Sequence, residues 1–402
     1  MSDAKRNILF VNDSLHIGGG EKSLISLLNL IDYSRYNVDL LLFKRGGEFE
    51  QFLPDEVNII EPPASMTDLL STSIFGLTIN GRIRETIARL RFSLLVRLQR
   101  KRQTVRDKNQ LFWSCFSDLI NGLDKKYDAA IAYSQGIPTF FVAEKVSAVK
   151  KFGWINVFYD LKDHQRQFQE KFYSTLDNIV IVSENSLENF KSVYPQFSHK
   201  MLVIHDICNA DMLYRMAELE EPHMLPAAIR LLTVARLDFH FKGLDITAKA
   251  CQILAERGVD FKWFIVGDGQ DREYLETFIS QHHLQDFLIL LGAKANPYPY
   301  FKNCDIYVQT SRQEGWGISL VEARLFNRPV VTTEFSTVWN QMVQMKNGIV
   351  TDFEPAHVAD AVEKLINDKD LYQSIYQYLM QEKKGNIEEI QKINKLLESM
   401  CD

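Results

Sequence analysis

The chain has 402 residues, 46% of them hydrophobic and 24% charged, with a formal net charge of −6 at pH 7. This length and composition favour a globular protein of two or three domains, and the acidic balance excludes a general basic surface for nucleic acid. Five scattered cysteines favour a reducing, cytoplasmic compartment, and the sequence shows neither a signal-peptide core nor an uncharged apolar run long enough to span a membrane.

Short apolar runs alternate with helical patterns through the first half of the chain. Residues 8–11 predict a strand, a glycine-rich turn follows, and residues 21–30 carry apolar side chains at helical spacing. Further strands are predicted over residues 38–43, 129–133, 179–182 and 201–204. Apolar runs of this kind are typical of parallel strands that helices cover on both faces of a sheet.

Residues 82–108 depart from the acidic balance, because they hold ten Lys or Arg against Glu85 and Asp107. Apolar residues recur there at helical spacing, and the pattern predicts an amphipathic helix with basic flanks. One interpretation is a helix bound to an anionic membrane surface, and the other is a helix packed on the N-terminal domain with a solvated basic rim. Binding to RNA is not favoured, because Phe92 is the only aromatic residue in this stretch. The apolar residues on one face are Ile83, Ile87, Leu90, Leu94 and Leu98.

A polar, proline-containing stretch over residues 218–223 suits a linker. After it, a second alternation predicts strands over residues 231–234, 263–266, 287–291, 306–308 and 330–331. We therefore expect two doubly wound α/β domains facing across a cleft, with ligands bound outside the carboxyl ends of the strands. The expected bounds are 1–215 for the N-terminal domain with its basic insertion at about 82–108, 216–228 for the linker, 229–380 for the C-terminal domain and 381–402 for a C-terminal helix.

The most informative motif is the segment 311–323, SRQEGWGISLVEA. Glu314 is predicted at the C-terminal end of a strand, and Glu322 lies about two turns into the following helix. Gly315 and Gly317 allow the backbone to approach a ligand, and the first helical turn offers free N–H groups to an anion such as a diphosphate. Taken alone, the spacing of the two carboxylates would favour a plainer interpretation, in which Glu314 is an acid at the start of a helix and Glu322 is a solvated or capped helix residue.

Three preceding segments support the first interpretation: Thr233–Leu237, Lys242-Gly243 and residues 264–269. With the motif above, they resemble the C-terminal domain of retaining glycosyltransferases of family 4, over roughly residues 229–366. At the N-terminus, Gly18–Ser23 looks like the Gly-Gly-x-Glu loop of that family. The resemblance implies a GT-B fold with two Rossmann-like domains. It also implies transfer of a sugar from a nucleotide-diphosphate sugar, with a UDP-sugar favoured and anomeric configuration retained.

The resemblance further implies roles for individual residues. Arg236 and Lys242 would hold the diphosphate, whose charge must be neutralised as the glycosidic bond breaks; two exposed loop cations are the plainer interpretation. Glu314 would bind sugar hydroxyls, and Glu322 would bind the ribose hydroxyls. Gly267 would line the donor pocket, although a tight turn would use it equally well. The other donor-binding residues would be Gly19, Gly20, Lys294, Gly315, Trp316, Gly317 and Ile318.

Three positions depart from the family pattern. Asn156 stands where the family has a histidine near the reacting sugar, and an amide cannot titrate near neutral pH. Asp160, Asp163 or His164 would supply another polar group nearby, and Asp206 replaces an asparagine. Asn327 stands in place of a glycine, and asparagine is the next-best residue for a left-handed helix C-cap. The candidate residues on the acceptor side are Glu21, Tyr133 and Asp160.

These observations favour a metal-independent glycosyltransferase without a cofactor, because no Asp-x-Asp ends a strand beside the expected cleft. Its acceptor would be a glycan or lipid-linked molecule of bacterial surface polysaccharide or glycoconjugate synthesis. The expected location is the cytoplasm, peripheral at the inner face of the cytoplasmic membrane. Two alternatives remain open: a non-catalytic nucleotide-sugar-binding subunit of a glycosyltransferase complex, motivated by Asn156, and a GT-B sugar-nucleotide epimerase.

Overall fold

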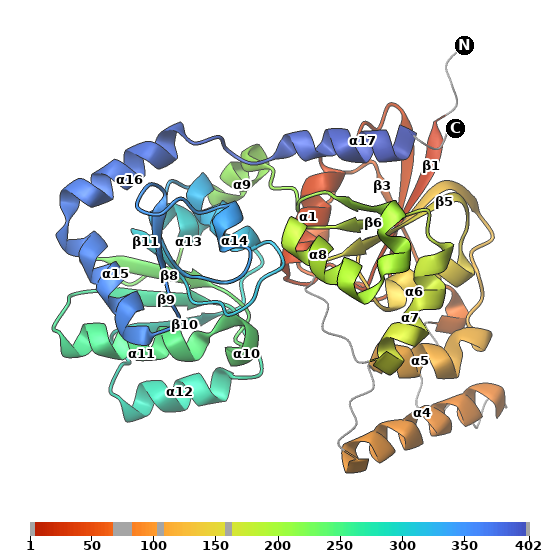
Figure 1. Ribbon diagram of the computed structural model, residues 1–402, viewed down its shortest axis with the longest axis horizontal. Helices are drawn as coiled ribbons and strands as arrows, with labels where there is room; N and C mark the ends of the chain where they lie inside the picture. Colours follow the sequence, from red (N-terminus) through yellow and green to blue (C-terminus); the bar gives the residue numbers. More distant parts are fainter. Residues whose placement is uncertain (1–4, 67–82, 103–107, 157–162, 399–402) are drawn as a thin grey trace. The chain divides into compact units, whose positions relative to one another are not determined.

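The computed structural model describes residues 5–66, 83–102, 108–156 and 163–398, and the side chains of all these except 99–102 and 163–164. The chain divides into two compact units (Figure 1). The first comprises residues 1–205 and 388–402, and the second comprises Asp206–Ile387. Each unit is built on a parallel sheet, which confirms the predicted pair of doubly wound α/β domains.

The described residues of the first unit form a seven-stranded sheet in the order β3-β2-β1-β4-β5-β6-β7, with every pairing parallel. Its interior strand β1 (Arg6–Asn12) is fully buried over residues 8–11, because helices cover the sheet on both faces. The other strands are β2 (Tyr36–Leu42), β3 (Val57–Ile60), β4 (Lys126–Ala132), β5 (Ser147–Ile155), β6 (Asn178–Ile181) and β7 (Met201–Val203).

Helices of the first unit mostly connect consecutive strands. They are α1 (Gly19–Leu28), α4 (Ile83–Arg102), α5 (Lys108–Phe116), α6 (Ile137–Lys145), α7 (Asp163–Thr175), α8 (Glu184–Val193) and α17 (Ile390–Glu398). Short 3₁₀ turns are found at η1 (Glu50–Phe52), η2 (Ser117–Leu119), η3 (Pro195–Lys200) and η5 (Ile387–Glu389). Helices α4 and α5 lie between β3 and β4, where the sequence predicted the basic insertion.

The second unit contains a six-stranded parallel sheet in the order β10-β9-β8-β11-β12-β13. The strands are β8 (Arg230–Val234), β9 (Lys262–Val266), β10 (Leu288–Gly292), β11 (Ile306–Gln309), β12 (Val330–Thr333) and β13 (Gly348–Thr351). The helices are α9 (Ala210–Ala217), α10 (Phe239–Lys242), α11 (Leu244–Glu256), α12 (Arg272–Gln281), α13 (Tyr298–Asn303), α14 (Ile318–Leu325), α15 (Pro355–Asn367) and α16 (Lys369–Gln381), and a 3₁₀ turn is found at η4 (Val338–Asn340).

Alternate side chains of the second sheet pack into two separate apolar layers, one on each face of the sheet. Trp263 and Ile265 of β9 join a buried cluster with side chains of α11, α12, α15 and α16. On the other face, Tyr307 of β11 packs against Phe301 of α13, with ring centroids 5.2 Å apart. Because successive strand residues point to opposite faces, a continuous apolar run is needed where both faces are covered.

The chain passes from the first unit to the second after His205 and returns to the first after Ile387. Residues 210–215 of α9 fall within the expected N-terminal range, but the helix belongs to the second unit, where Asn296 Nδ2 donates a 2.7 Å hydrogen bond to the carbonyl of Met216. Helix α17 returns to the first unit (Figure 1), where Glu398 pairs with Arg35 at 2.9 Å. Long-range contacts of this kind have no local signal in the sequence.

An ionisable cluster anchors η5 and α17 on the first unit. The backbone N–H and ring of His205 both meet the Glu389 carboxylate, and the ring also meets Glu184 at 3.2 Å. Burial alone would lower the pKa of His205, but its hydrogen bonds with Glu389 and Glu184 raise the pKa above its ordinary value of 6.5. Burial alone would raise the pKa of Glu389, but hydrogen bonds from His205 and Lys392 lower it from 4.5 to about 2.

These shifts predict a pH window for the docking of α17. Protonated His205 stabilises the docked helix fully below pH 6.5, and this stabilisation is lost as the pH rises through the raised pKa of His205. Ionised Glu389 stabilises the docked helix fully above pH 4.5, and this stabilisation is lost as the pH falls toward 2. Amide hydrogen exchange in α17, corrected for its intrinsic pH dependence, is expected to be slowest between these limits and several-fold faster above them. Glu389→Gln should flatten this profile, and Glu398→Gln, which removes only the exposed pair with Arg35, is the control. A pH-independent profile in the unmodified protein would contradict the prediction.

The strand order also locates the point in each sheet where successive connections turn in opposite directions. In the first unit it lies between β1 and β4, and in the second between β8 and β11. Ligands of open α/β sheets bind at the carboxyl ends of such strand pairs. Among the residues that the structure describes, no helix is both long and apolar enough to cross a membrane.

Candidate functional site

The predicted donor residues of the second unit gather at the carboxyl end of its sheet. Arg236 follows β8 and Glu314 follows β11, and these two strands pair at the switch point. Lys242 ends the one-turn helix α10, which lies between β8 and α11. The structure thus places these three charged side chains on loops that leave two adjacent strands, where an α/β sheet binds its ligands.

Lys242 and Glu314 form a close ion pair. Lys242 Nζ lies 2.7 Å from Glu314 Oε1 and 2.6 Å from Oε2, and both side chains are largely buried. Glu314 Oε1 also accepts hydrogen bonds from Ser311 Oγ at 2.6 Å and Gln309 Nε2 at 3.2 Å. The carboxylate is therefore held by several donors, and it keeps the ammonium group of Lys242 in one position.

Backbone contacts fix α10 against the loop that carries Glu314. The carbonyl of Phe241 accepts hydrogen bonds from the N–H groups of Arg312 and Gln313, at 2.8 and 3.2 Å. The Arg312 guanidinium binds both carboxylate oxygens of Asp245 at 2.7 Å and also donates to the carbonyl of Phe239. This bidentate pair sets the geometry that brings Lys242 to Glu314.

Arg236 is far more exposed than Lys242, with 64% of its side chain accessible, and its Nη2 lies 3.4 Å from Asp238 Oδ2. Asp238 is buried, and it accepts a hydrogen bond from the N–H of Phe241 as the N-cap of α10. Because its guanidinium is exposed and only weakly paired, Arg236 has the freedom to turn toward a phosphate group.

The loop between Glu314 and α14 ends in a left-handed residue, because Gly317 has φ = +80° and precedes the first residue of the helix, Ile318. Such a conformation favours glycine. The preceding carbonyl, that of Trp316, accepts a hydrogen bond from Gln341 Nε2. Gln341 is in turn held through its own carbonyl by Asn347 Nδ2 at 3.0 Å. Neither Gln341 nor Asn347 is predicted from the sequence, because both belong to a different segment of the chain and to no motif.

Glu322 is completely buried, which the sequence analysis did not foresee. Its Oε1 accepts a 2.9 Å hydrogen bond from the hydroxyl of Tyr298 at the start of α13. Burial, together with the charge of Glu322, raises the pKa of Tyr298 well above its ordinary value, so this hydroxyl remains protonated and continues to donate. A ribose hydroxyl would therefore have to reach a carboxylate that already has a protein partner.

Two other predicted donor residues lie at neighbouring strand ends. Gly267 follows β9, and a side-chain carbon there would lie 1.8 Å from the carbonyl oxygen of Ala235. This close approach of two backbone segments requires a glycine whether or not a ligand binds. Lys294 is partly buried in the loop after β10. Asn327, next to the C-cap of α14, has φ = +55°, which confirms its predicted left-handed conformation.

In the first unit, the predicted loop forms the first turn of α1. Gly19 begins the helix, and Glu21 folds back so that its Oε2 lies 2.1 Å from where a Gly18 side chain would begin. Gly20 faces Asn156, whose Nδ2 lies 3.1 Å from the position of a Gly20 side chain. Asn156 follows β5, so the structure brings the segments that follow β1 and β5 together.

Asn156 and Tyr133 are in direct contact. Asn156 Nδ2 donates a 2.8 Å hydrogen bond to the Tyr133 carbonyl, and its backbone N–H reaches Gln135 Oε1 at 3.3 Å. Within the described chain, no donor reaches the buried Asn156 Oδ1. The Tyr133 side chain is buried, and its hydroxyl lies 2.8 Å from Ser23 Oγ. Tyr133 therefore contacts Ser23 through its side chain and Asn156 through its backbone carbonyl.

Several remaining candidates have no described role at this edge. Asp160 lies outside the described residues, and for Asp163 and His164 only the backbone, at the start of α7, is described. Asp206 is buried at the beginning of the second unit, where its carbonyl accepts a hydrogen bond from Asn386 Nδ2. Across the part of the chain described, no three His, Cys, Asp or Glu side chains are grouped so that they could hold a metal ion.

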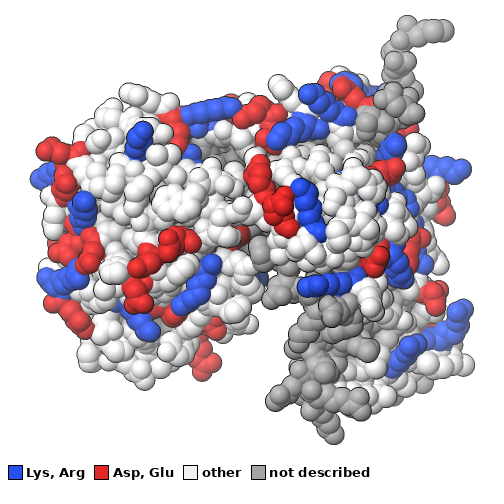
Figure 2. All heavy atoms as spheres, viewed as in Figure 1, with Lys and Arg blue, Asp and Glu red and all other residues white. Residues whose placement is uncertain are grey.

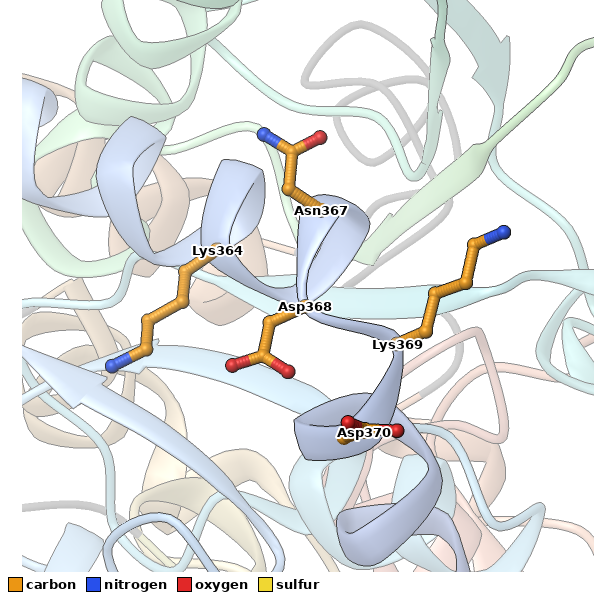
Figure 3. Close-up of a pocket in the computed structure, with 5 residues that line it drawn as sticks. All are labelled: Lys364, Asn367, Asp368, Lys369 and Asp370. Carbon is orange, nitrogen blue, oxygen red and sulfur yellow. The ribbon is translucent and has the colours of Figure 1, made fainter.

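A pocket of about 570 Å³ lies elsewhere, at the junction of α15 and α16. Its residues Lys364, Asn367, Asp368, Lys369 and Asp370 point in different directions (Figure 3). Asp368 caps α16 by accepting a hydrogen bond from the N–H of Leu371. We attribute this pocket to the turn between two helices, because its polar groups do not converge on a common point.

Comparison with known proteins identifies curated relatives over part of the chain. An uncharacterized glycosyltransferase of Methanocaldococcus jannaschii is 24% identical over 261 residues, which are 56% of this chain and 64% of that protein. The poly(glycerol-phosphate) alpha-glucosyltransferase of Bacillus subtilis is 25% identical over 217 residues, 54% of this chain and 31% of that protein. The matches therefore span less than two thirds of these curated relatives.

A solved structure resembles the fold over almost the whole chain. The HepE protein of Anabaena, crystallised with UDP and glucose, aligns with a TM-score of 0.69 and 18% identity, covering 98% of this chain and 100% of that one. The model of the family Glycosyl transferases group 1 matches residues 225–381, which include every donor residue described in the second unit. Residues 225–381 are thus similar to the Glycosyl transferases group 1 family, and the chain has the GT-B fold.

Proposed function

We propose that the protein transfers a sugar from a UDP-sugar to a glycan or lipid-linked acceptor, with retention of anomeric configuration. The observation that carries this proposal is the Lys242–Glu314 pair, which lies at the switch point of the second sheet just before α14. A cation, a sugar-binding carboxylate and the free N–H groups of a helical turn are the groups that a nucleotide-diphosphate sugar requires there.

In this proposal Lys242 and Arg236 neutralise the diphosphate as the bond between sugar and phosphate breaks. Glu314 binds sugar hydroxyls, and the backbone of Gly315–Ile318 lines the sugar and phosphate groups. The acceptor hydroxyl oxygen forms a bond to the anomeric carbon, on the face from which the diphosphate leaves with the bonding electron pair. The leaving diphosphate also takes the acceptor's proton, so the protein acts by positioning and by electrostatic stabilisation. Asn156, as a hydrogen-bond donor without an ionisable proton, is compatible with such a reaction.

We further propose a role in the synthesis of a bacterial surface polysaccharide or glycoconjugate, at the cytoplasmic face of the membrane. Support comes from the Bacillus subtilis relative, which is named for glucosylating poly(glycerol-phosphate). Metal-independent hexosyl transfer is part of the proposal, because the two basic residues supply the positive charge that the departing diphosphate needs.

The first test is a thermal-shift screen of nucleoside diphosphates and nucleotide sugars. A ligand present at 100 times its dissociation constant stabilises the folded state by about 2.7 kcal/mol, so we expect UDP and one UDP-sugar to raise the melting temperature. Release of UDP from that sugar in the presence of acceptor extracts would then demonstrate transfer. Stabilisation by GDP or ADP instead of UDP would overturn the choice of donor, and the absence of any nucleotide effect would overturn the proposal.

One observation favours a second candidate, a nucleotide-sugar-binding subunit without catalysis. Asn156 replaces the titratable residue that the family resemblance implies, and its Oδ1 has no donor in the described chain. Such a subunit would be stabilised by the UDP-sugar but would release no UDP with any acceptor. An epimerase would convert the donor without an acceptor, and analysis of the recovered sugar distinguishes that outcome.

A further inference from the structure

Helix α4 leaves a stripe of large apolar side chains exposed. Ile83, Ile87, Leu90, Leu94 and Leu98 are each between 41% and 69% exposed. Their spacing of three or four residues places all five on one side of the helix. A contiguous exposed stripe of this kind, unlike single exposed apolar residues, marks an interaction site.

The opposite side of α4 is packed on the first unit, so the stripe is not simply a consequence of an unattached helix. Ala88 is buried, and the ring of Phe92 lies 5.6 Å from that of Phe116 and 6.3 Å from that of Phe112. Both aromatic partners belong to the α5 segment, which enters the main apolar core. Helix α4 therefore has two apolar faces, and among the residues that the structure describes only one of these faces is covered.

Basic side chains flank the exposed stripe on both sides. At 3.6 residues per turn, Arg84 and Arg91 lie along one edge of the stripe and Arg97 along the other, and all three are exposed. Figure 2 shows basic side chains beside uncharged surface at the lower right, where α4 lies in Figure 1. This concentration of positive charge is exceptional in a chain whose formal net charge is −6.

The apolar stripe and its basic flanks together favour one kind of binding partner for the exposed face of α4. An anionic lipid surface offers negative headgroups beside an apolar interior, and it would receive both sets of side chains at once. A second copy of α4 would bring like charges together across a two-fold contact. A nucleic acid strand would leave the stripe without apolar partners, because none of the five side chains is an aromatic base-stacking group.

We propose that the exposed face of α4 docks the first unit on an anionic membrane, with the five apolar side chains entering the headgroup boundary and the flanking arginines binding lipid phosphates. This inference rests on the proposed function only for its biological meaning, which is to bring the enzyme to a lipid-linked acceptor. Its test uses neither donor nor acceptor.

The experiment is co-sedimentation of the full chain with phosphatidylcholine vesicles, with and without phosphatidylglycerol. We expect binding only to the anionic vesicles, weakened by salt because exposed charges are screened. Ile87→Ser, Leu90→Ser and Leu94→Ser combined should lower partitioning by about 10²-fold, because burial of apolar area drives insertion. Arg84→Gln, Arg91→Gln and Arg97→Gln combined should lower it by a similar factor of about 10² on anionic vesicles. Val149→Ser, at an exposed apolar site on β5, is the matched control and should bind normally.

Each other outcome overturns the inference. No binding of the unmodified protein to anionic vesicles, or unchanged binding of the serine variant, would exclude α4 as the docking surface. A concentration-dependent dimer that the serine variant abolishes would assign the stripe to a second copy, and RNA binding lost in the glutamine variant would assign the charge to nucleic acid. Thermal stabilisation by UDP, measured on the same variants, reports the donor site separately, so failure of docking and failure of the proposed transferase function are distinguishable.

Discussion

Lys242→Ala is expected to lower turnover by about 10²-fold or more, comparable to the loss of one preorganised group that stabilises a transition state. The physical reason is that Lys242 is the less exposed of the two candidate cations and is held in place by both oxygens of Glu314. In the proposed reaction it meets the charge that develops on the departing diphosphate. Its removal also leaves a largely buried carboxylate to which, among the described residues, Ser311 and Gln309 still donate.

Steady-state turnover with the identified donor and a thermal melt, with and without UDP, provide the measurement. Lys302→Ala is the matched control, because Lys302 forms an ion pair of similar length with Glu218, at 2.7 Å, but both side chains are well exposed. It should change neither activity nor UDP binding, since exposed pairs contribute little to stability. If Lys242→Ala lowers only the melting temperature and keeps normal turnover and UDP stabilisation, the ion pair has a purely structural role.

Glu314→Gln and Glu322→Gln are expected to have separate effects. Glu314 lies in the loop between β11 and α14 and would contact the sugar, so its substitution should lower turnover by about 10-fold or more with little change in affinity for free UDP. Glu322 lies deeper, on α14, and would contact the ribose in both ground and transition states. Its substitution should weaken UDP binding by about 10-fold, which corresponds to about 1.4 kcal/mol.

Titration calorimetry with UDP, beside turnover assays on both variants, tests this separation. Because Glu322 is buried and bonded to Tyr298, Tyr298→Phe is needed as a control for structural damage. That variant keeps the ring but removes the donor, and we expect a loss of stability of about 1–3 kcal/mol. If Tyr298→Phe and Glu322→Gln lose UDP affinity equally, burial and packing explain the effect. If Glu314→Gln loses UDP affinity as strongly as Glu322→Gln, the assignment of the two carboxylates is wrong.

The sequence by itself determined the class of fold and the order of its parts. Continuous apolar runs such as residues 8–11 and 263–266 predicted strands covered on both faces, and the structure has them as buried, parallel strands in the interior of the two sheets. The sequence also determined the left-handed conformation at Asn327, because it depends on one residue's own conformational preference. The placement of Arg236 and Glu314 at strand ends followed from periodicity, and their chemical roles stay predictions.

Only the tertiary structure decided which of these groups meet. Lys242 and Glu314 are 72 positions apart, and Tyr298 and Glu322 are 24 apart, so neither pairing has a local signal. The same holds for Gln341, which reaches the Trp316 carbonyl from another segment, and for α17, which returns to the first unit. In α4, periodicity predicted an apolar face but did not determine whether the protein covers it. Packing through Ala88 and Phe92 decided that, because a helix with two apolar faces can bury only one against a single neighbour.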